Sequence, residues 1–588
     1  MRIEYVDITN FRGIAKAKIE FNSHTVLIGD NNAGKSTVFE AIDLVLGPDR
    51  LSRLPVIDEH DFFNGRYFVE EGDNPKIEIE LVITELEPDQ HNRFKNHTEF
   101  WDKDSKIILQ PGSIDEVDLP HIVPALRVKF VGYYNVDDDD FSGETFFCWP
   151  INEDDTLTKF AKGDKRECGF LYLRALRTGS RALSMERGSL LDIILRIKEI
   201  RPKMWENVLS QLRHTEVAED PELGIKGVLE GVQNALKEYV PSDWGSEPIL
   251  RVSDLTREHL RKTLTVFMST GPGSYHAPFH HQGTGTINTM VLALLSMIAE
   301  LKKNVIFAME EPEIAIPPYT QKRIVDSIKN KSSQAIFTSH SPFVLEEFPP
   351  KQIVLIQRSH DGIVESQFIR FPKNIKPKQY SREFRLRFAE SLLAKRILLT
   401  EGTTEANGYG AAARRLNELK GDKYSSLEEM GIAVFDAGSD TAIANFGEYF
   451  RSLGKIVFAV FDKQDPAQLE KIKAAVHYPF ESEYTGFESQ ILAGTDDDLL
   501  ENYYWNLINN GEWPESLHKY QYNDDDEIGI DEIKKALFNF LKKSKGDYAV
   551  SDLLGACERS TQVPLSIRKV LKSIRDILDT PPVTDMED

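Results

Sequence analysis

The feature that most constrains this fold is a glycine-rich loop, GDNNAGKS, at residues 29–36. The sequence predicts a strand over residues 25–28 before the loop and a helix after it that ends at Gly47-Pro48. The loop fits G-x-x-x-x-G-K-[ST], in which backbone amides and a helix N-terminus surround phosphate groups. We therefore expect Lys35 to supply positive charge to the β and γ phosphates of a nucleotide and Ser36 to ligate Mg²⁺. The expected nucleotide-binding residues of this segment are Gly29, Asn31, Asn32, Ala33, Gly34, Lys35, Ser36 and Thr37.

Two later segments offer the groups that nucleotide hydrolysis requires. A phosphate-binding loop needs an acidic strand end to hold Mg²⁺ and polarise water, and NVIFAMEEPE at residues 304–313 supplies one. We expect Glu310 to orient the metal shell of the nucleotide site and Glu311 to act as the base for the attacking water. A further apolar strand in SQAIFTSHSP leads to His340, which we place near the γ-phosphate or its water. A lone histidine at a strand end is usually structural, but the order of these segments favours a functional one.

Length and composition limit the broad class of protein. A chain of 588 residues exceeds what one hydrophobic core usually organises, so we expect two or more domains. No stretch approaches the roughly 20 apolar residues that cross a bilayer, and the first residues lack an apolar signal core, so neither a membrane nor export is expected. Cys148, Cys168 and Cys557 are too scattered for a disulfide or metal framework, which fits a reducing cytoplasm.

Charge is unevenly distributed along the chain. The net charge of −23 argues against a nonspecific coat on nucleic acid. Lysines and arginines nevertheless concentrate between Arg370 and Arg396, where only Glu383 and Glu390 oppose them. Such a block is either a solvated linker or a segment that follows phosphates, and both interpretations stay open.

A second group of acids follows short apolar runs in the C-terminal half. RILLTEGTTE (396–405), GIAVFDAGSD (431–440) and KIVFAVFDKQDPA (455–467) each end in acids and alternate with helical patterns, which is typical of a parallel α/β sheet. Ligands bind outside the carboxyl ends of such strands, so the strand-end acids converge there. Buried together, Glu401, Glu405, Asp462 and Asp465 would repel one another unless cations lay among them. Oxygen-only ligands suit Mg²⁺ or Mn²⁺ rather than Zn²⁺.

The N-terminal segments resemble the ATP-binding-cassette (ABC) ATPases of the SMC and RecF type, over residues 1 to about 370. ITNFRGI, with Arg12, is similar to the opening strand and turn of that family. The resemblance makes HQGTGTINTM (281–290) the signature segment that contacts ATP on the opposite subunit, where Gly283 and Gly285 allow close backbone approach. It implies ATP as the nucleotide and a homo-oligomer, a dimer or higher, formed through the ATPase heads. Pro317 departs from the family, since many relatives carry a histidine there.

The C-terminal acids resemble the Toprim domain of topoisomerases, DnaG-type primases and some nucleases. An ABC ATPase followed by such a domain is similar to the overcoming-lysogenization-defect (OLD) family nucleases, which include the nuclease subunit of the Gabija antiphage system. The resemblance covers almost the whole chain. Matched to it, Glu401 and Glu405 form the E-G-x-x-E element and Asp462 is the first acid of D-x-D.

The chain departs from this family pattern at one metal-binding position. Gln464 stands at the second acid of D-x-D, so either Asp465 reaches the metal through a shifted loop or one ion is held by fewer charges. Glu488 resembles the acid after the family's next strand, although Gly486 replaces the usual serine. Lys545 is similar to the family's C-terminal catalytic lysine, with Lys543 as the alternative.

The resemblance implies an ATP-regulated DNA endonuclease or nickase with a two-metal mechanism that uses Mg²⁺ or Mn²⁺. It also implies a role in antiphage defence or DNA processing, with DNA as substrate and a defence-system protein as partner. A rival of a different class is a RecF-like ATP-dependent DNA-binding scaffold whose Toprim domain does not cut, which Gln464 keeps open. A topoisomerase or primase is disfavoured, because the chain has no room for a tyrosine-bearing strand-passage domain or a polymerase apparatus.

We therefore expect an α/β chain with an SMC/RecF-type ABC ATPase domain, a helical insertion, a Toprim parallel-sheet domain and a helical C-terminal segment. The apolar spacing in SLLDIILRIKEI and VLEGVQNALKEYV indicates the helices of the insertion, which we interpret as a dimerisation arm. The expected boundaries are 1–180 and 261–370 for the two parts of the ATPase, 181–260 for the insertion, 371–395 for a basic linker, 396–575 for the Toprim domain with its C-terminal helices and 576–588 for a disordered tail.

Overall fold

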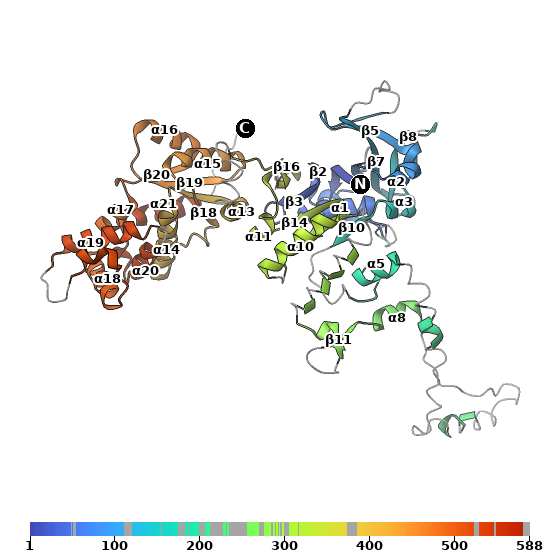
Figure 1. Ribbon diagram of the computed structural model, residues 1–588. Coiled ribbons are helices and arrows are strands. Elements are labelled where there is room, and N and C mark those ends of the chain that lie inside the picture. The colour runs from blue at the N-terminus through green and yellow to red at the C-terminus, as the bar shows by residue number, and fades with distance from the viewer. Residues whose placement is uncertain are drawn as a thin grey trace. The chain divides into compact units, whose positions relative to one another are not determined.

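The computed structural model divides the chain into two compact units (Figure 1). Unit 1 comprises Met1–His340 and Gln352–Gln367, and unit 2 comprises Ser341–Lys351 and Phe368–Asp588. The structure describes residues 1–48, 50, 55–110, 120–154, 156–173, 256–269, 276–283, 305–314, 317–372, 385–522, 528–545 and 548–579, with short pieces of 183–233 and 286–298.

Unit 1 is built around one sheet of 14 strands, five of which run parallel in the order β10-β13-β14-β3-β15. The bounds of these five are β3 His24–Ile28, β10 Phe170–Leu173, β13 Ile306–Glu310, β14 Gln334–Thr338 and β15 Ile353–Arg358. Parallel strands end at the same edge of a sheet. The loops that follow β3, β13 and β14 are therefore neighbours.

The rest of this sheet continues in the order β16-β2-β1-β4-β7-β5-β6, with β8 paired to β7 and β9 paired to β8. The bounds are β1 Arg2–Phe11, β2 Ile14–Glu20, β4 Ile77–Thr84, β5 Thr98–Asp102, β6 Ile107–Leu109, β7 Ile122–Asn135, β8 Asp140–Ile151, β9 Leu157–Lys159 and β16 Ile363–Phe368. Strands β1, β2, β4 and β7 pair antiparallel, and buried residues alternate with partly exposed ones along much of β2 and the first half of β4. This alternation is typical of antiparallel strands with one face on a core.

Helix α1 (Lys35–Leu46) packs against β1, β4, β7 and β10. It fully buries Val38, Ile42 and Val45, whose spacing of three and four residues forms one apolar face. Burial of each such side chain contributes about 1.5–3 kcal/mol. The helix ends where Gly47 donates its N–H to the Asp43 carbonyl at 2.8 Å, so the predicted strand, loop and helix are confirmed.

The other described helices of unit 1 are α2 Pro88–Phe94, α3 Lys162–Glu167, α5 Leu190–Ile197, α8 Arg257–Thr263 and α10 Pro318–Lys331. A small antiparallel pair, β11 Phe267–Ser269 and β12 His276–Pro278, follows α8. Helices α5 and α8 lie within or beside the predicted insertion, most of which falls outside the described residues. Its role as a dimerisation arm stays a prediction.

Unit 2 contains a four-stranded parallel sheet in the order β18-β17-β19-β20. The bounds are β17 Arg396–Thr400, β18 Ile432–Asp436, β19 Ile456–Phe461 and β20 Tyr478–Glu481. Arg396 aligns with Ile432 on one side and Ile456 on the other, so these strands share one register. Helices α14 Thr403–Lys420, α15 Asp440–Ser452 and α16 Pro466–Ala475 connect them, which confirms the predicted α/β alternation.

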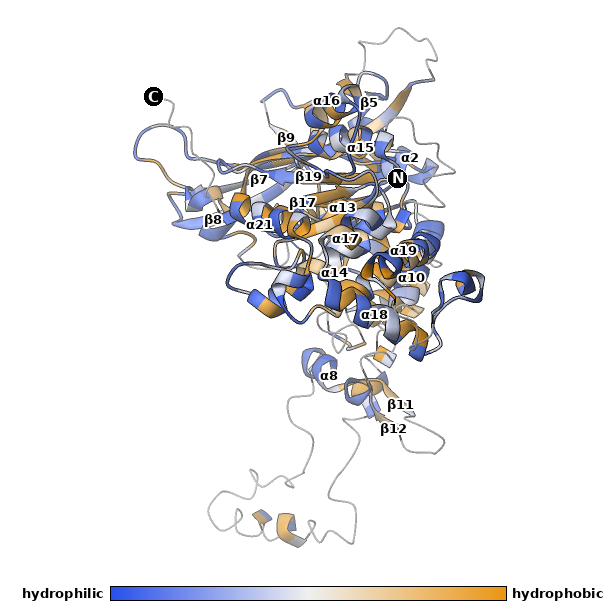
Figure 2. Ribbon diagram, turned by 90° about the vertical axis from the view of Figure 1, so that its left-hand side faces the viewer, coloured by the Kyte–Doolittle hydropathy of each residue, from blue (hydrophilic) through white to orange (hydrophobic). Residues whose placement is uncertain are grey.

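The C-terminal helices share a core with the sheet through α14. Their bounds are α17 Phe487–Gly494, α18 Asp497–Asn509, α19 Ile530–Lys543, α20 Ala549–Gly555 and α21 Leu565–Asp579. Tyr409, Phe487, Tyr504 and Leu553 are among the buried residues of this core, and Figure 2 shows hydrophobic residues on β17 and β19. The predicted helical C-terminal segment is confirmed.

Two boundaries differ from the sequence prediction. Residues 385–393, placed in the basic linker, form helix α13 (Arg385–Leu393), because Phe388, Ala389 and Leu392 supply a buried face. Residues 576–579, placed in the tail, belong to α21. A short helix, α11 (Pro342–Leu345), completes unit 2. Among the helices of the described residues, none combines the length and the apolar character needed to cross a membrane.

Candidate nucleotide and metal sites

The loop between β3 and α1 has the backbone that its glycines predict. Gly29 has φ +151°, and a Cβ there would lie 2.2 Å from the Ile356 carbonyl oxygen. Gly34, at φ +98°, is the residue before α1, and Asn32 also has positive φ. These conformations favour glycine or asparagine. The loop therefore turns sharply onto a helix N-terminus, which is the geometry of a phosphate cradle.

Lys35 points back into this loop. Its ammonium donates to the carbonyl oxygens of Gly29 and Asp30, each at 2.8 Å, and the residue is 7% exposed. Burial lowers the pKa of Lys35, while the nearby charge of Glu311 opposes that shift. Ser36 is exposed on the first turn of α1 and Thr37 follows half-buried, so both lie beside the loop as predicted.

The acids after β13 lie at the same edge. Glu310 accepts a hydrogen bond from the Tyr172 hydroxyl at 2.9 Å. Glu311 adopts φ +42° and donates its backbone N–H to the Thr338 carbonyl at 2.9 Å, which ties the ends of β13 and β14 together. Its strained backbone turns this residue away from the strand direction.

His340 and Glu313 complete this edge. Burial, followed by the charge of Lys35, lowers the pKa of His340, which favours the neutral imidazole. Glu313 accepts from the His340 backbone N–H at 2.6 Å and from the Ser339 hydroxyl at 3.0 Å. The structure thus brings Lys35, Glu311 and His340 together, and Glu313 positions the His340 loop. Sequence reasoning did not assign Glu313, although it is the last residue of the acidic NVIFAMEEPE run.

Two further segments belong to the predicted nucleotide site, the opening turn with Arg12 and the signature segment with Gly283. Arg12 forms ion pairs with Glu40 of α1 and, at 2.7 Å, with Asp61, so it fastens the opening turn to the loop helix. The Gly283 carbonyl accepts from Thr286 and Ile287 amides at 3.0 and 3.2 Å. Gly285 lies outside the described residues.

In unit 2 the acids gather at the carboxyl end of the parallel sheet. Glu401 directly follows β17 and Asp462 directly follows the neighbouring β19. Glu405 lies in the first turn of α14, and Glu488 lies in the first turn of α17. Glu401 and Glu405 therefore face the same site, because one follows the end of β17 and the other lies in the first turn of the next helix, α14.

Glu401 is held by donors from the loop after β19. Its Oε1 accepts from the Asp462 backbone N–H at 2.8 Å and from the Gln464 side-chain amide at 3.1 Å. Burial, with the negative charges of Asp462 and Glu405, raises the pKa of Glu401 to about 7. Gln464 therefore lies inside the group of acids at the position where the family pattern has an aspartate.

The other acids repel one another in the same way. Burial, followed by the charge of Glu488, raises the pKa of Asp462 to about 6. Burial, followed by Asp462 and Glu488, also raises the pKa of Glu405. Such shifts mark a place where negative charges meet out of water.

Lys545 is the counter-charge of this group. Its Nζ lies 3.2 Å from Oε1 of Glu488, whose side chain is 7% exposed. The positive charge of Lys545 also partly offsets the rise in the pKa values of Asp462 and Glu405.

Asp465 caps a helix in this structure. Its Oδ1 accepts from the backbone amides of Ala467 and Gln468 at 3.0 and 3.1 Å, which caps α16. Asp436, at the end of β18, accepts hydrogen bonds from Arg387 and Thr403 at 2.6 Å each. Neither contact belongs to the Glu401 group, so metal binding by Asp465 stays a prediction.

The donor set fits a hard divalent cation, because it consists of carboxylate oxygens whose mutual repulsion a cation would relieve. In the described structure, no three of these acids bring ligand oxygens within 4.8 Å of one another. Two of the four acids already have partners within the protein. Glu401 accepts a hydrogen bond from Gln464, and Glu488 pairs with Lys545. Cation binding therefore requires side-chain rearrangement.

A family model for the AAA ATPase domain matches residues 1–167 and 196–345. The chain belongs to this family. A second model, the overcoming lysogenization defect protein-like TOPRIM domain, matches residues 392–463, which include β17, Glu401, Glu405 and Asp462. The predicted combination of an ATPase with an OLD-like TOPRIM domain is confirmed.

Three curated relatives match this chain at low identity. The OLD nuclease of Thermus scotoductus is 23% identical over 483 residues, which span 75% of this chain and 78% of the relative. The Old nuclease of Escherichia phage P2 is 21% identical over 71% of this chain and 70% of the relative. Endonuclease GajA of Bacillus cereus is 20% identical over 69% of this chain and 66% of its own length.

Among solved structures, the SMC head domain from Thermotoga maritima is 13% identical to this chain. The match covers 63% of this chain and 100% of that one, with a TM-score of 0.30. An SMC head bound to the C-terminal winged-helix domain of ScpA gives 15% identity, 64% and 100% coverage and a TM-score of 0.34.

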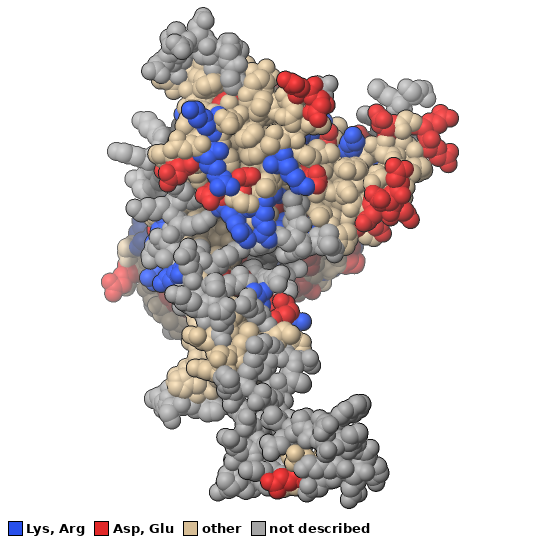
Figure 3. Space-filling view, turned by 90° about the vertical axis from the view of Figure 1, so that its right-hand side faces the viewer, with Lys and Arg blue, Asp and Glu red and all other residues tan. Residues whose placement is uncertain are grey.

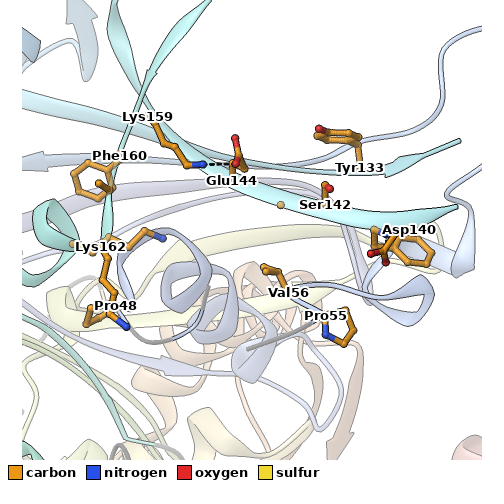
Figure 4. Close-up of a pocket in the computed structure, with 14 residues that line it drawn as sticks. Pro48, Pro55, Val56, Tyr133, Asp140, Ser142, Glu144, Lys159, Phe160 and Lys162 are labelled. Carbon is orange, nitrogen blue, oxygen red and sulfur yellow. Dashed lines mark hydrogen bonds and ion pairs between the residues drawn. The ribbon is translucent and has the colours of Figure 1, made fainter. Parts of the chain in front are cut away.

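A cavity of about 940 Å³ lies at the other end of α1 from the ATPase loop (Figure 4). Lys162 extends beside Pro48 there, and Lys159 pairs with Glu144 across the upper wall. Lys165, also in the lining, donates to the Leu44 carbonyl at 2.8 Å and the Thr145 hydroxyl at 2.9 Å. Because α1 has 12 residues, about 18 Å separates this cavity from Lys35.

Charged side chains are unevenly distributed over the face of the chain in Figure 3. Figure 3 shows lysines and arginines near the centre of one face and acids in separate groups toward its edges. Asp102, Asp104 and His121 form a compact group in the ATPase unit that sequence reasoning missed. Asp102 accepts from the Ser105 hydroxyl at 2.6 Å and the Asp104 amide at 2.9 Å, so turn formation explains it.

Proposed function

We propose that this chain is an ATP-regulated, metal-dependent nuclease whose TOPRIM domain hydrolyses phosphodiester bonds of DNA as an endonuclease or nickase. The observation that carries the proposal is the convergence of Glu401, Glu405, Asp462 and Glu488 at the carboxyl end of one parallel sheet, where burial raises the pKa of the first three. The nuclease names of the three relatives support the same activity.

The four acids are the proposed metal ligands of the TOPRIM domain. Mg²⁺ or Mn²⁺ bound there would supply a hydroxide nucleophile and stabilise the leaving oxygen. Glu401 and Asp462 lie at adjacent strand ends, while Glu405 and Glu488 approach from the first turns of two helices. Asp465 remains the alternative ligand if its loop shifts. Lys545 carries the positive charge that would offset charge developing on the scissile phosphate.

The ATPase domain is the proposed control element. Lys35 and the amides of residues 29–37 would bind the ATP phosphates, with Ser36 and Glu310 in the Mg²⁺ shell. Glu311 is the proposed base for water, and neutral His340 would contact the γ-phosphate or that water. Gly283 and Gly285 are proposed to reach ATP bound to a second copy, so the working form is a homo-oligomer.

The proposed setting is antiphage defence or DNA processing in the cytoplasm. The OLD-like TOPRIM match supports it. The ligands and partners are then ATP, Mg²⁺ or Mn²⁺, DNA and a defence-system protein.

Cleavage of supercoiled plasmid tests the proposal. Purified protein with Mg²⁺ or Mn²⁺ should convert supercoiled to open-circular or linear DNA, and Glu401→Ala should abolish that conversion. Glu418→Ala is a matched control, because Glu418 is an exposed acid near the far end of α14, the helix that follows Glu401. Metal-dependent cleavage that survives in Glu401→Ala removes Glu401 from the mechanism.

A DNA-binding scaffold is the second candidate, and Gln464 favours it. An amide in place of an acid leaves the site with one fewer negative charge to hold a second cation. A scaffold would bind plasmid in an ATP-dependent way and leave it intact with either metal. Cleavage by wild type that is lost in Glu401→Ala excludes that candidate.

A further inference from the structure

The ion pair between Lys545 and Glu488 joins side chains of very different exposure. The Lys545 side chain is 61% exposed, whereas the Glu488 side chain is 7% exposed, and Nζ lies 3.2 Å from Oε1. A buried carboxylate without a partner is costly, so Glu488 depends on this ammonium in the absence of another cation. The long, exposed lysine stem can leave without unpacking the core.

Lys545 also neutralises more than its direct partner. Its charge acts on Asp462 and on Glu405, both of which Glu488 repels. One ammonium therefore stabilises three acids from two helices and a strand end. A cation bound among these acids would meet the positive charge of Lys545 at close range.

The chain position of Lys545 allows movement. Helix α19 ends at Lys543, and Ser544 caps it through a backbone N–H to the Phe540 carbonyl at 2.9 Å. Lys545 is the second residue beyond that end and belongs to a turn. Its side chain is thus carried on a loop, while Glu488 is fixed on α17.

We infer that Lys545 takes the place of a cation beside Glu488 in the metal-free site and leaves Glu488 when a divalent cation binds, which frees its ammonium for the phosphate of the DNA substrate. The inference rests on the proposed metal-dependent nuclease function. Lys545 then sets metal affinity as well as serving the substrate. The two roles oppose each other, because removal of Lys545 should strengthen metal binding and weaken cleavage.

Mn²⁺ binding to the full-length, nucleotide-free chain tests this inference without any turnover. Free Mn²⁺ can be followed by electron paramagnetic resonance for wild type, Lys545→Met, Lys545→Arg and Lys543→Met. We expect Lys545→Met to bind Mn²⁺ about threefold to tenfold more tightly, since a competing charge is lost. Lys545→Arg keeps the ion pair and should bind like wild type. Lys543→Met is the matched control at the end of α19 and should also bind like wild type.

The outcomes separate this inference from the proposed function. Equal or weaker Mn²⁺ binding by Lys545→Met overturns the inference while leaving the metal site in place. If Glu401→Gln binds Mn²⁺ as well as wild type does, the ion is elsewhere and both the site and the inference fail. With plasmid DNA, Lys545→Met should show a lower kcat despite tighter metal binding. If Lys545 had only a structural role, its removal would not strengthen metal binding while lowering kcat.

Discussion

Gln464 Nε2 lies 3.1 Å from Glu401 Oε1, so the side chain at the second D-x-D position contacts the first glutamate of the site directly. The amide also lies 3.2 Å from the Asp462 carbonyl. Asp465, one residue later, caps α16 instead. In the loop after β19, Gln464 therefore contacts Glu401, whereas Asp465 caps α16.

The role of Asp465 as the N-cap of α16 predicts what its substitution does to stability and to cleavage. Asp465→Ala should lower the free energy of unfolding by about 1 kcal/mol, because an N-cap is lost, and should retain cleavage. Asp465→Ser should restore most of the stability. Denaturant unfolding and the plasmid assay check both. Loss of cleavage in a stably folded Asp465→Ser variant would instead favour the shifted-loop interpretation, in which Asp465 binds metal.

The ATPase site is tested by two substitutions with different expected signatures. Lys35→Ala should weaken ATP binding, since the ammonium that faces the loop is removed. Glu311→Gln should slow hydrolysis and leave ATP bound, since only the proposed base is changed. Steady-state phosphate release and nucleotide retention on a filter measure these effects. Unchanged hydrolysis in both variants rejects the assigned site.

The backbone of the ATPase loop makes Gly29 sensitive to a single methyl group. Gly29→Ala should destabilise unit 1 by about 1–3 kcal/mol and weaken ATP binding, because its φ is +151° and the new Cβ would meet the Ile356 carbonyl. Gly410→Ala is the control, since it lies in α14 with open space around its Cβ position. Thermal unfolding with and without ATP distinguishes the two. Equal behaviour of both variants would contradict the loop geometry.

The buried ammonium of Lys165 should make the stability of the folded chain depend on pH. Burial lowers its pKa to about 7 from 10.5, so between these values the unfolded chain binds more protons than the folded one. Stability of wild type should therefore rise with pH across that window relative to Lys165→Met, which cannot titrate. The difference in Tm, variant minus wild type, should fall from pH 7 to pH 10. A constant difference would mean that Lys165 titrates normally.

The sequence predicted those parts of the fold that depend on local pattern. Residues 25–47 combine an apolar strand, a glycine loop and an amphipathic helix, and the structure has all three. The three acidic strand ends predicted the unit 2 sheet, because alternating apolar runs and helices favour parallel strands. The family comparison then confirmed the pairing of the two domains.

Other features depended on contacts distant in sequence. The sequence spacing of Gln464 and Asp465 did not show which one faces Glu401, since that depends on a loop conformation. Helix α13 was missed because it follows a run of basic residues and its own buried face is short. The choice of Lys545 over Lys543 came from resemblance, and the pairing of Lys545 with Glu488 now supports it.

The most direct test of the central claim is anomalous diffraction from crystals of the protein soaked in Mn²⁺. The account predicts anomalous density among the carboxylates of Glu401, Glu405, Asp462 and Glu488, at about 2.0–2.3 Å from their oxygens, with Lys545 withdrawn from Glu488. Density confined to other sites, with Glu401 still bound to Gln464 and Glu488 to Lys545, would contradict it.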